Sequence, residues 1–205
     1  MTALVSACEL SQADQLVPQI LPWLHEAGNP YFDFLFGGSD AARTVLDRWM
    51  RRASSEVFFS RAVLLTAGGR PVAGFIALTG AELNACRRSD LAALAMSGGR
   101  RQREEILGRL ALVHDLFPAV GEQDLYLSKI WVESQYRGAG FARELMTAYL
   151  AAGRARGCAR FRLDVCAENQ RAIRMYRSFG FTDLRQSAAP GTGLRYLAMT
   201  AKVTS

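Results

Sequence analysis

The sequence predicts a mixed α/β fold, and three observations support this class. Two apolar runs flank Gly68-Gly69, a dipeptide that easily adopts positive φ and therefore marks a β-hairpin. An Ala-, Leu- and Arg-rich region at helical spacing follows over residues 81–117. Strand-like and helix-like segments then alternate toward the C-terminus. We therefore expect residues 1–205 to form a single domain with a substantial core.

The segment before the hairpin is expected to be mainly helical. The opening residues, MTALVSACEL, predict a strand rather than a secretory leader, because they lack a basic start and a long apolar run. Residues 12–27 place apolar side chains every four positions after Ser11, which predicts a capped helix. Residues 28–38, GNPYFDFLFGG, predict an irregular turn, and residues 39–53 predict a second helix.

The region after the hairpin is expected to alternate between helices and strands. Residues 81–117 predict one or two helices inserted between strands, since SGG at 97–99 interrupts the helical pattern. Apolar or alternating runs predict strands at 124–133, 159–167 and 193–200. Helical spacing predicts helices at 140–157 and 169–181, which end at Gly157 and Gly180.

The charge balance favours phosphorylated ligands without identifying one. The net charge is +6, from 25 Lys and Arg against 19 Asp and Glu, which raises the affinity for polyanions. RRQR at 100–103 is the nearest approach to a basic run, and no nucleic-acid motif accompanies it, so we expect no specific nucleic-acid partner. No run approaches the roughly 18 apolar residues of a membrane span, so we expect no membrane association either.

The cysteines and histidines are too scattered for a metal site or a disulfide framework. No C-x-x-C pair occurs, and the two histidines lie far apart in the chain. We therefore expect no metal and a reducing, cytoplasmic location. The residues concerned are Cys8, Cys86, Cys158, Cys166, His25 and His114.

A segment with two closely spaced glycines, QYRGAGFARELM at 135–146, follows a predicted strand and leads into a predicted helix. The first amide N–H groups of a helix have no intrahelical partner, and the helix dipole adds positive charge there. Gly138 and Gly140 carry no side chain that would hold a bulky anion at a distance, and Arg137 adds a full charge. The segment therefore predicts a cradle for phosphate or pyrophosphate.

Two common phosphate loops do not match this segment. A Walker A loop needs a lysine and a longer glycine spacing. A Rossmann fingerprint needs a third glycine where Arg143 stands, together with an acidic residue about 20 positions later. A tight turn from strand to helix, without any ligand, is the remaining alternative.

Two motifs in order resemble the GNAT superfamily of N-acetyltransferases. QYRGAG at 135–140 resembles its acetyl-CoA loop, and NQRAIRMYRSFGF at 169–181 resembles the helix that completes its cofactor site. The resemblance is specific over residues 125–181 and looser before them. It implies the GNAT acyl-CoA N-acyltransferase fold, in which a mainly antiparallel central sheet is flanked by helices. The helical region 81–117 would then be an insertion between strands 3 and 4.

The resemblance also implies how acetyl-CoA is held. A V-shaped opening would separate strand 125–132 from strand 160–166, and the pantetheine arm would pair there with free main-chain groups. A backbone N–H beside the thioester would polarise its carbonyl. The implied cofactor-binding residues are Ile130, Val132, Arg137, Gly138, Ala139, Gly140, Phe141, Ala142, Asn169 and Tyr176.

Tyr176 is the expected general acid, because the leaving thiolate needs a proton that a phenol can supply. The alternative is a core tyrosine beside Ile173 and Phe179, and Asn169 would cap its helix in either case. The expected base is Asp124, at the start of a strand, although a solvated turn acid or an ordered water are alternatives. Further base candidates are Glu133, Glu82 and His114.

Several other side chains have two interpretations each. Cys166 is expected to be a small buried thiol rather than an acyl-carrying nucleophile. Three arginines on the second motif helix are expected to form a solvated face, or else to hold the 3′-phosphate of CoA. These are Arg171, Arg174 and Arg177.

The acceptor is the least constrained part of the prediction. The aromatic residues of the segment 28–38 either wall a pocket for an apolar or ring-bearing amine or attach the first helix to the sheet; they are Tyr31, Phe32, Phe34 and Phe36. Nearby acids would suit a cationic amine, namely Asp33, Glu82 and Asp124. These features do not choose among an antibiotic, a polyamine, an amino acid and a protein terminus.

The predicted function is therefore an acetyl-CoA-dependent N-acetyltransferase that transfers the acetyl group directly to a primary amine. Acetyl-CoA and the amine acceptor are the expected partners, and a homodimer is an open option. The alternatives are a non-catalytic acyl-CoA-binding or regulatory module on the same fold, and a transferase with another acyl-CoA donor. A nucleic-acid-binding protein with an incidental glycine turn is a third.

Overall fold

The computed structural model describes residues 2–7, 13–96 and 98–203. The strands are β1 (Thr2–Ser6), β2 (Ala62–Ala67), β3 (Arg70–Thr79), β4 (Leu125–Val132), β5 (Arg160–Cys166), β6 (Thr182–Ala188) and β7 (Arg195–Lys202). The helices are α1 (Ala13–Gly28), α2 (Tyr31–Phe36), α3 (Ser39–Met50), α4 (Gly80–Met96), α5 (Arg100–Val113), α6 (Phe141–Ala155) and α7 (Gln170–Ser178).

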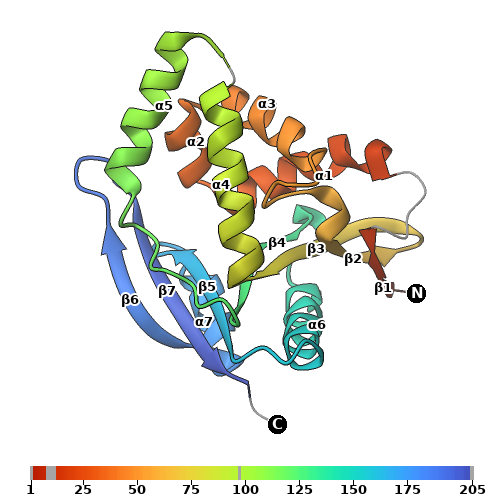
Figure 1. Ribbon diagram of the computed structural model, residues 1–205. Coiled ribbons are helices and arrows are strands. Elements are labelled where there is room, and N and C mark those ends of the chain that lie inside the picture. The colour runs from red at the N-terminus through yellow and green to blue at the C-terminus, as the bar shows by residue number, and fades with distance from the viewer. Residues whose placement is uncertain (1, 8–12, 97, 204–205) are drawn as a thin grey trace.

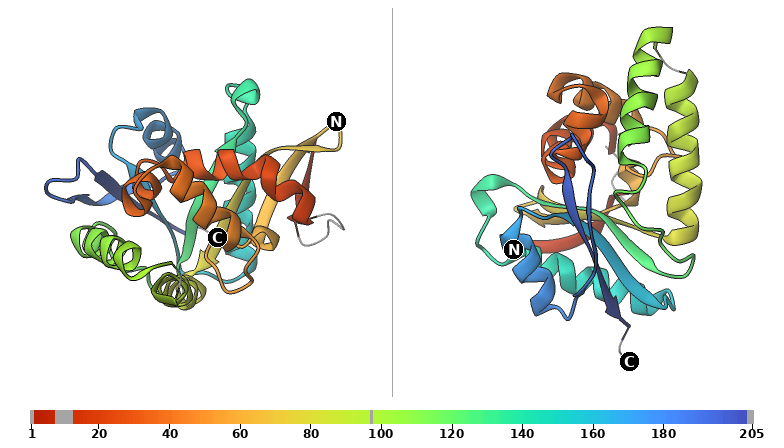
Figure 2. Two further views of the ribbon diagram at one scale, coloured as in Figure 1. Left: turned by 90° about the horizontal axis from the view of Figure 1, so that it is seen from above. Right: turned by 90° about the vertical axis from the view of Figure 1, so that its left-hand side faces the viewer.

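The seven strands form one sheet in the order β1-β2-β3-β4-β5-β7-β6. Strands β4 and β5 run parallel, and the other neighbouring pairs are antiparallel. Helices α1 to α5 lie on one face of the sheet, and α6 and α7 lie on the other (Figure 1; Figure 2). The predicted mixed α/β fold and the mainly antiparallel sheet are thereby confirmed.

Each face of the sheet buries its own hydrophobic core. The core under α1 to α5 includes Tyr126 and Trp131 of β4, and the core against α6 and α7 includes Leu125 and Leu127. Side chains of a strand alternate between faces, so Tyr126 and Trp131, an odd number of residues apart, should point in opposite directions. They share a face because β4 carries an irregularity between them.

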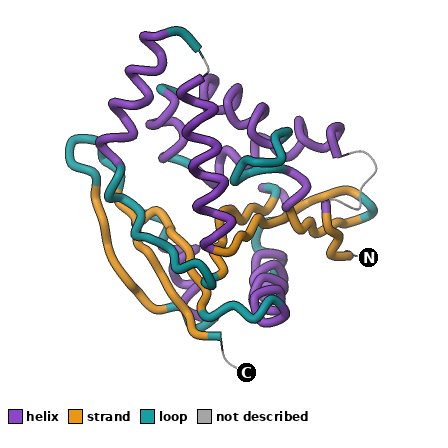
Figure 3. The backbone as a smooth tube through the Cα atoms, viewed as in Figure 1, coloured by secondary structure: helices purple, strands orange, loops and turns teal. Residues whose placement is uncertain are grey.

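This irregularity is a β-bulge that opens the sheet. Along β4 the register passes from Leu127, opposite Ala77, to Lys129, opposite Ile76, so Ser128 is the extra residue. The pairing of β4 with β5 covers only residues 125–127 and 161–163. Beyond that point β4 and β5 are not paired, and the predicted opening begins there. Figure 3 shows the strands of the sheet in orange.

The helical region 81–117 is confirmed as an insertion between strands 3 and 4. It forms α4 and α5, which project together from the sheet and are separated near Gly98-Gly99, as expected (Figure 1). Among the described helices, none combines the length and the hydropathy needed to cross a membrane.

Three local expectations were wrong. Residues 31–36 form the helix α2 rather than a turn, with Phe32, Leu35 and Phe36 buried at helical spacing. Strand β6 was not expected, because nearly all of its side chains are exposed at the sheet edge and show no apolar alternation. The second helix ends at Met50 rather than at residue 53. Ser11 and Cys8 lie outside the described residues.

Candidate active site

The glycine loop has the geometry of an anion cradle. Gly138 and Gly140 have φ values of 92° and 90°, which side-chain-bearing residues rarely adopt. A Cβ atom on either glycine would meet no atom within 4 Å, so open space lies beside both. Within the described residues, the amide N–H groups of Gly138, Gly140, Phe141 and Ala142 have no protein acceptor. The start of α6 therefore offers several free donors and its dipole to an anion.

Not all of the predicted loop donors are free. The N–H of Arg137 donates to the Ser134 carbonyl at 3.2 Å, and that of Ala139 donates to the Tyr136 carbonyl at 3.3 Å. These two hydrogen bonds close the turn, and the turn leaves the other four amide N–H groups of the loop free. The predicted set of backbone donors therefore reduces to Gly138, Gly140, Phe141 and Ala142.

Three arginines line the cavity into which the cradle opens, namely Arg137, Arg143 and Arg171. Arg137 contacts the Glu26 carboxylate at 2.7 Å and the Val132 carbonyl at 3.1 Å, so it ties the loop to α1 and β4. Arg143 lies over the Phe179 ring at 5.1 Å, which joins α6 to the end of α7. These positions suit a ligand with several phosphate groups.

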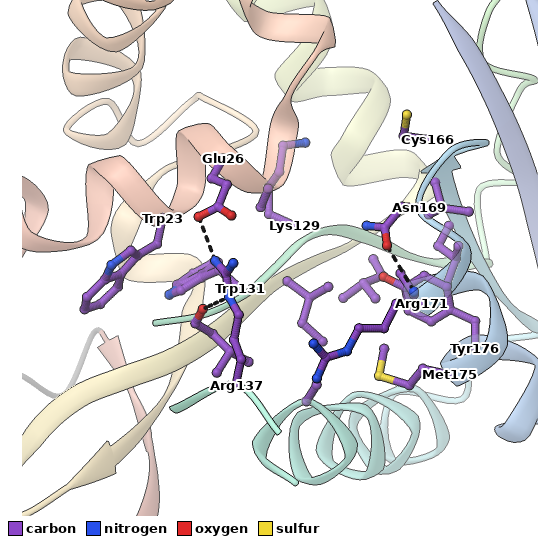
Figure 4. Close-up of a pocket in the computed structure, with 18 of the residues that line it drawn as sticks. Trp23, Glu26, Lys129, Trp131, Arg137, Cys166, Asn169, Arg171, Met175 and Tyr176 are labelled. Atoms are coloured by element: carbon purple, nitrogen blue, oxygen red, sulfur yellow. Dashed lines mark hydrogen bonds and ion pairs between the residues drawn. The ribbon is translucent and has the colours of Figure 1, made fainter. Parts of the chain in front are cut away.

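A cavity of about 510 Å³ connects the cradle to the opening between β4 and β5. Figure 4 shows Glu26 and Arg137 on one side of it and Tyr176 and Asn169 on the other. Ile130 and Val132, the predicted pantetheine contacts, also line it, as do Phe141 and Ala142. Beyond residue 127, β4 is not paired with β5, so its main-chain groups there are available to a bound ligand, apart from the Val132 carbonyl, which accepts a hydrogen bond from Arg137.

Helix α7 contributes Tyr176 and Asn169 to the cavity. Tyr176 is only 6% exposed, and its ring lies 6.1 Å from that of Phe181. Burial raises the pKa of its phenol well above the ordinary value, so the group stays protonated and can donate. Asn169 caps α7 as expected, since its Oδ1 accepts the Ala172 N–H at 3.1 Å.

Replacing Asn169 with alanine should therefore weaken the second motif helix. We expect the free energy of unfolding to fall by about 1 kcal/mol, because the cap bond is lost. Chemical denaturation followed by circular dichroism measures this change. Arg174→Ala, at an exposed position of the same helix, is the matched control and should change the free energy by less than about 0.5 kcal/mol. Equal stability of the two variants would show that the cap is dispensable.

The placement of Asp124 argues against its predicted role as the base. Its side chain is 2% exposed and pairs with Arg160 at 3.0 Å and Arg162 at 4.0 Å. It also accepts the Gly121 N–H at 3.2 Å. It lies at the closed end of the β4–β5 pair and lines neither of the two cavities described here. The acid therefore stabilises the turn before β4.

The other predicted bases are also engaged in structure. Glu82 accepts the Thr79 N–H at 2.7 Å, which caps α4, and Glu133 pairs with Arg70 at 2.8 Å. Neither lines the cavity beside the glycine loop. Asp33 accepts bonds from Ser39 and Asn29 and contacts His25 at 2.7 Å, so it organises the ends of α1 and α2.

A second cavity, of about 330 Å³, is lined mainly by residues of α2, α4 and α5. It shares Ser128, Lys129, Asp164 and Tyr196 with the first cavity, so the two meet at the opening between β4 and β5. Of the predicted aromatic walls, Tyr31 and Phe32 line it and Phe34 and Phe36 do not. His114 lies at its exposed rim.

A buried charged cluster, which sequence reasoning missed, stands where the cavities meet. Glu56 accepts bonds from Ser128 at 2.6 Å and Arg87 at 3.2 Å, and lies 3.8 Å from Lys129. Burial raises the pKa of Glu56, but the two cations outweigh it and hold the pKa below its ordinary value. Asp164 completes the cluster. The sequence gives little signal of this cluster, because Asp164 occupies an ordinary polar position in the alternating strand RFRLDVC.

The structure bears on the two interpretations of Cys166 and of the three arginines on α7. Cys166 lines the cavity beside the glycine loop and is half-buried rather than buried, and its thiol donates to Glu168 at 2.9 Å. Burial and that bond raise the pKa of the thiol, which disfavours a thiolate nucleophile. Arg171 borders the cavity, whereas Arg177 pairs with Asp183 at 2.8 Å and Arg174 is exposed.

Comparison with known proteins assigns the family. The profile of the acetyltransferase (GNAT) family matches residues 24–181. Thialysine N-epsilon-acetyltransferase from Mus musculus is 29% identical over 89 residues, which are 43% of this chain and 52% of that protein. The match thus spans about half the length of this curated relative.

Solved structures agree on the fold. An N-acetyltransferase from Staphylococcus aureus superposes with a TM-score of 0.66 at 16% identity, over 92% of this chain and 96% of that one. The NatC complex bound to Gag peptide and CoA gives a TM-score of 0.55 at 13% identity, over 99% of each chain. With its sheet, its glycine loop and a family match over most of its length, the chain belongs to the GNAT family of acetyltransferases.

Proposed function

We propose that this protein is an acetyl-CoA-dependent N-acetyltransferase that transfers the acetyl group directly to a primary amine. One observation carries the proposal: the free amide donors of the glycine loop and the diverging strands β4 and β5 open into the same cavity. A long ligand with a polyphosphate at one end and an amide-containing arm needs both features, side by side.

The residues present fit acetyl-CoA. The four free amides at the start of α6 would hold the pyrophosphate, with Arg143 and Arg171 beside the phosphates. Ile130 and Val132 would meet the pantetheine arm through their main chain. Acetyl-CoA supplies an activated acyl group, and Tyr176 would protonate the sulfur as it leaves. Asn169 would face the arm while capping α7.

The acceptor is proposed to be an amine. The mouse relative is named for acetylating the ε-nitrogen of thialysine, which supports nitrogen rather than oxygen or sulfur as the nucleophile. We also propose a reducing, cytoplasmic compartment, because Cys86, Cys158 and Cys166 are free thiols.

Calorimetric titration with acetyl-CoA tests the proposal, with NAD and ATP as control ligands. We expect saturable binding of acetyl-CoA alone, followed by thiol release when a panel of primary amines is added. Absence of acetyl-CoA binding would refute the cofactor site. Binding without turnover of any amine would favour the non-catalytic module, and stronger competition by succinyl-CoA or a long-chain acyl-CoA would favour another donor.

A further inference from the structure

We propose that the second cavity binds the acceptor, a primary ammonium ion carried on an aromatic or other apolar body, and that Asp164 is the catalytic base that takes its proton. This inference rests on the proposed function, because it places the acceptor beside the acetyl-CoA cavity. It goes further by assigning a residue, a site and a substrate class.

The position of Asp164 is the first argument. It follows Leu163, the last residue of β5 that pairs with β4, and lines both cavities where they meet. Its Oδ2 accepts the Tyr126 hydroxyl at 3.0 Å. Its Oδ1 is buried and has no hydrogen-bond partner among the described residues. A buried carboxylate oxygen without a partner is costly, and an ammonium N–H would satisfy it.

The lining of the second cavity is the second argument. Its walls carry six aromatic rings, from Tyr31, Phe32, Trp49, Phe117, Tyr126 and Tyr196. Phe117 lies edge-on to Tyr31 at 5.1 Å and to Tyr196 at 5.0 Å, so part of the wall is a fixed aromatic surface. Such a wall suits an apolar body rather than a polar one.

The charges of the second cavity are the third argument. Arg87 and Lys129 both contact Glu56, so one carboxylate faces two cations, and the second negative charge beside them is that of Asp164. Asp90 is separately paired with Arg52. Asp164, in contrast, has a neutral hydroxyl donor as its closest hydrogen-bond partner. An incoming ammonium group would therefore find a hydrogen-bond acceptor in Oδ1 of Asp164, which has no hydrogen-bond donor among the described residues.

The protonation state of Asp164 suits a base. Burial raises the pKa of its carboxyl to about 6, although several facing groups oppose this rise. These are Tyr126 and Lys129 of β4, Arg87 of α4 and Arg162 of β5. A group with this pKa is mostly ionised at neutral pH and is a stronger base than an exposed aspartate.

The proton and electron balance of the step is complete. The ammonium transfers one proton to the Asp164 carboxylate, and the resulting nitrogen lone pair forms a C–N bond with the acetyl carbonyl carbon. The C–S bond breaks, and the sulfur takes the electron pair and a proton from Tyr176. The second nitrogen proton restores the Tyr176 phenol, and Asp164 releases its proton to solvent with the product.

Asp164→Asn tests the base with phenethylamine as the acceptor. We expect kcat/KM at pH 7.5 to fall by roughly 10²–10⁴-fold while the affinity for acetyl-CoA is unchanged. In the wild type, kcat/KM should rise with pH through about 6, and this limb should vanish in the variant. Asp115→Asn, at an exposed acid beside His114, is the matched control and should behave as wild type.

The variant Tyr126→Phe tests whether Asp164 acts as a base or has only a structural role. The Tyr126 hydroxyl holds the pKa of Asp164 down, so its removal should shift the acidic limb of the profile to higher pH. A purely structural Asp164 would leave the limb unmoved. Full wild-type kcat/KM in Asp164→Asn, with acetyl-CoA bound normally, would overturn the assignment of the base and leave the proposed function intact.

Leu91→Trp tests the acceptor site. Leu91 of α4 lines the second cavity and is 47% exposed. A larger side chain there should narrow the cavity with little change in the free energy of unfolding. We expect the KM for phenethylamine to rise about tenfold. Leu107→Trp on α5 is the matched control, since Leu107 is equally exposed at 47% and lines neither cavity.

A panel of acceptors tests the substrate class. Phenethylamine should exceed lysine and spermidine in kcat/KM by at least about tenfold, because the aromatic wall favours an apolar body. A preference for lysine or spermidine, or no turnover of phenethylamine by a protein that binds acetyl-CoA, would overturn the class. Failure to bind acetyl-CoA at all would instead refute the proposed function.

Discussion

Replacing Gly140 with glutamate should abolish acetyl-CoA binding while the protein still folds. The residue precedes α6, where free amides face open space, and a carboxylate there would occupy the position proposed for the pyrophosphate. It would also repel the remaining phosphates. We expect the affinity measured by calorimetry to fall by at least about 100-fold. Gly138→Glu should act in the same way.

The control must separate the added charge from backbone strain. Gly157→Glu is matched, because Gly157 also has positive φ, at 63°, and open space beside it, but lies just beyond the C-terminal end of α6. Both variants should lose similar stability in thermal melts, on the order of 1 kcal/mol from left-handed strain. Undiminished acetyl-CoA affinity in folded Gly140→Glu would show that the loop is only a turn.

Replacing Tyr176 with phenylalanine should lower turnover by roughly 10²–10⁴-fold. The phenol is buried beside the cavity proposed for acetyl-CoA and its raised pKa keeps it protonated, which suits a donor to a departing thiolate. The ring remains in Tyr176→Phe, so the affinity for acetyl-CoA should change little. Single-turnover thiol release measures the chemical step directly.

A second buried tyrosine provides the control for this variant. The Tyr149 hydroxyl donates to the main-chain carbonyl of Leu125 at 2.6 Å, and Tyr149 does not line the cavity. Tyr149→Phe should cost about 1 kcal/mol of stability without affecting turnover of the folded protein. If Tyr176→Phe turned over at the wild-type rate, Tyr176 would be a core residue and the proton would come from water.

Much of the fold could be predicted from local pattern. The insertion of α4 and α5, the strand β4 and the helix α6 follow from apolar spacing and from glycines at their ends. The exceptions have physical causes. The edge strand β6 buries too few side chains for its sequence to alternate between apolar and polar residues. In α2, apolar residues stand at nearly every position, so their spacing does not distinguish a helix from a turn.

The cofactor side of the site was also accessible from the sequence. The positive φ values of Gly138 and Gly140 and the cap formed by Asn169 depend on residues within a few positions of one another. Such features depend on residues that are close together in the sequence, so the spacing of a motif predicts them. The family resemblance then identified Tyr176, which the structure brings into the cavity.

The proposed acceptor side depends on tertiary structure alone. Asp124 was a plausible base until the fold placed Arg160 against it, 36 positions away in the chain. Asp164 became a candidate because Tyr126, 38 positions away, supplies one hydrogen bond and the bulge at Ser128 opens the sheet beside it. By itself, the sequence determined where backbone amides are left free, because that depends on local conformation. Only the fold decided which carboxylate is paired with arginine and which keeps an oxygen without a hydrogen-bond partner among the described residues, because that depends on long-range neighbours.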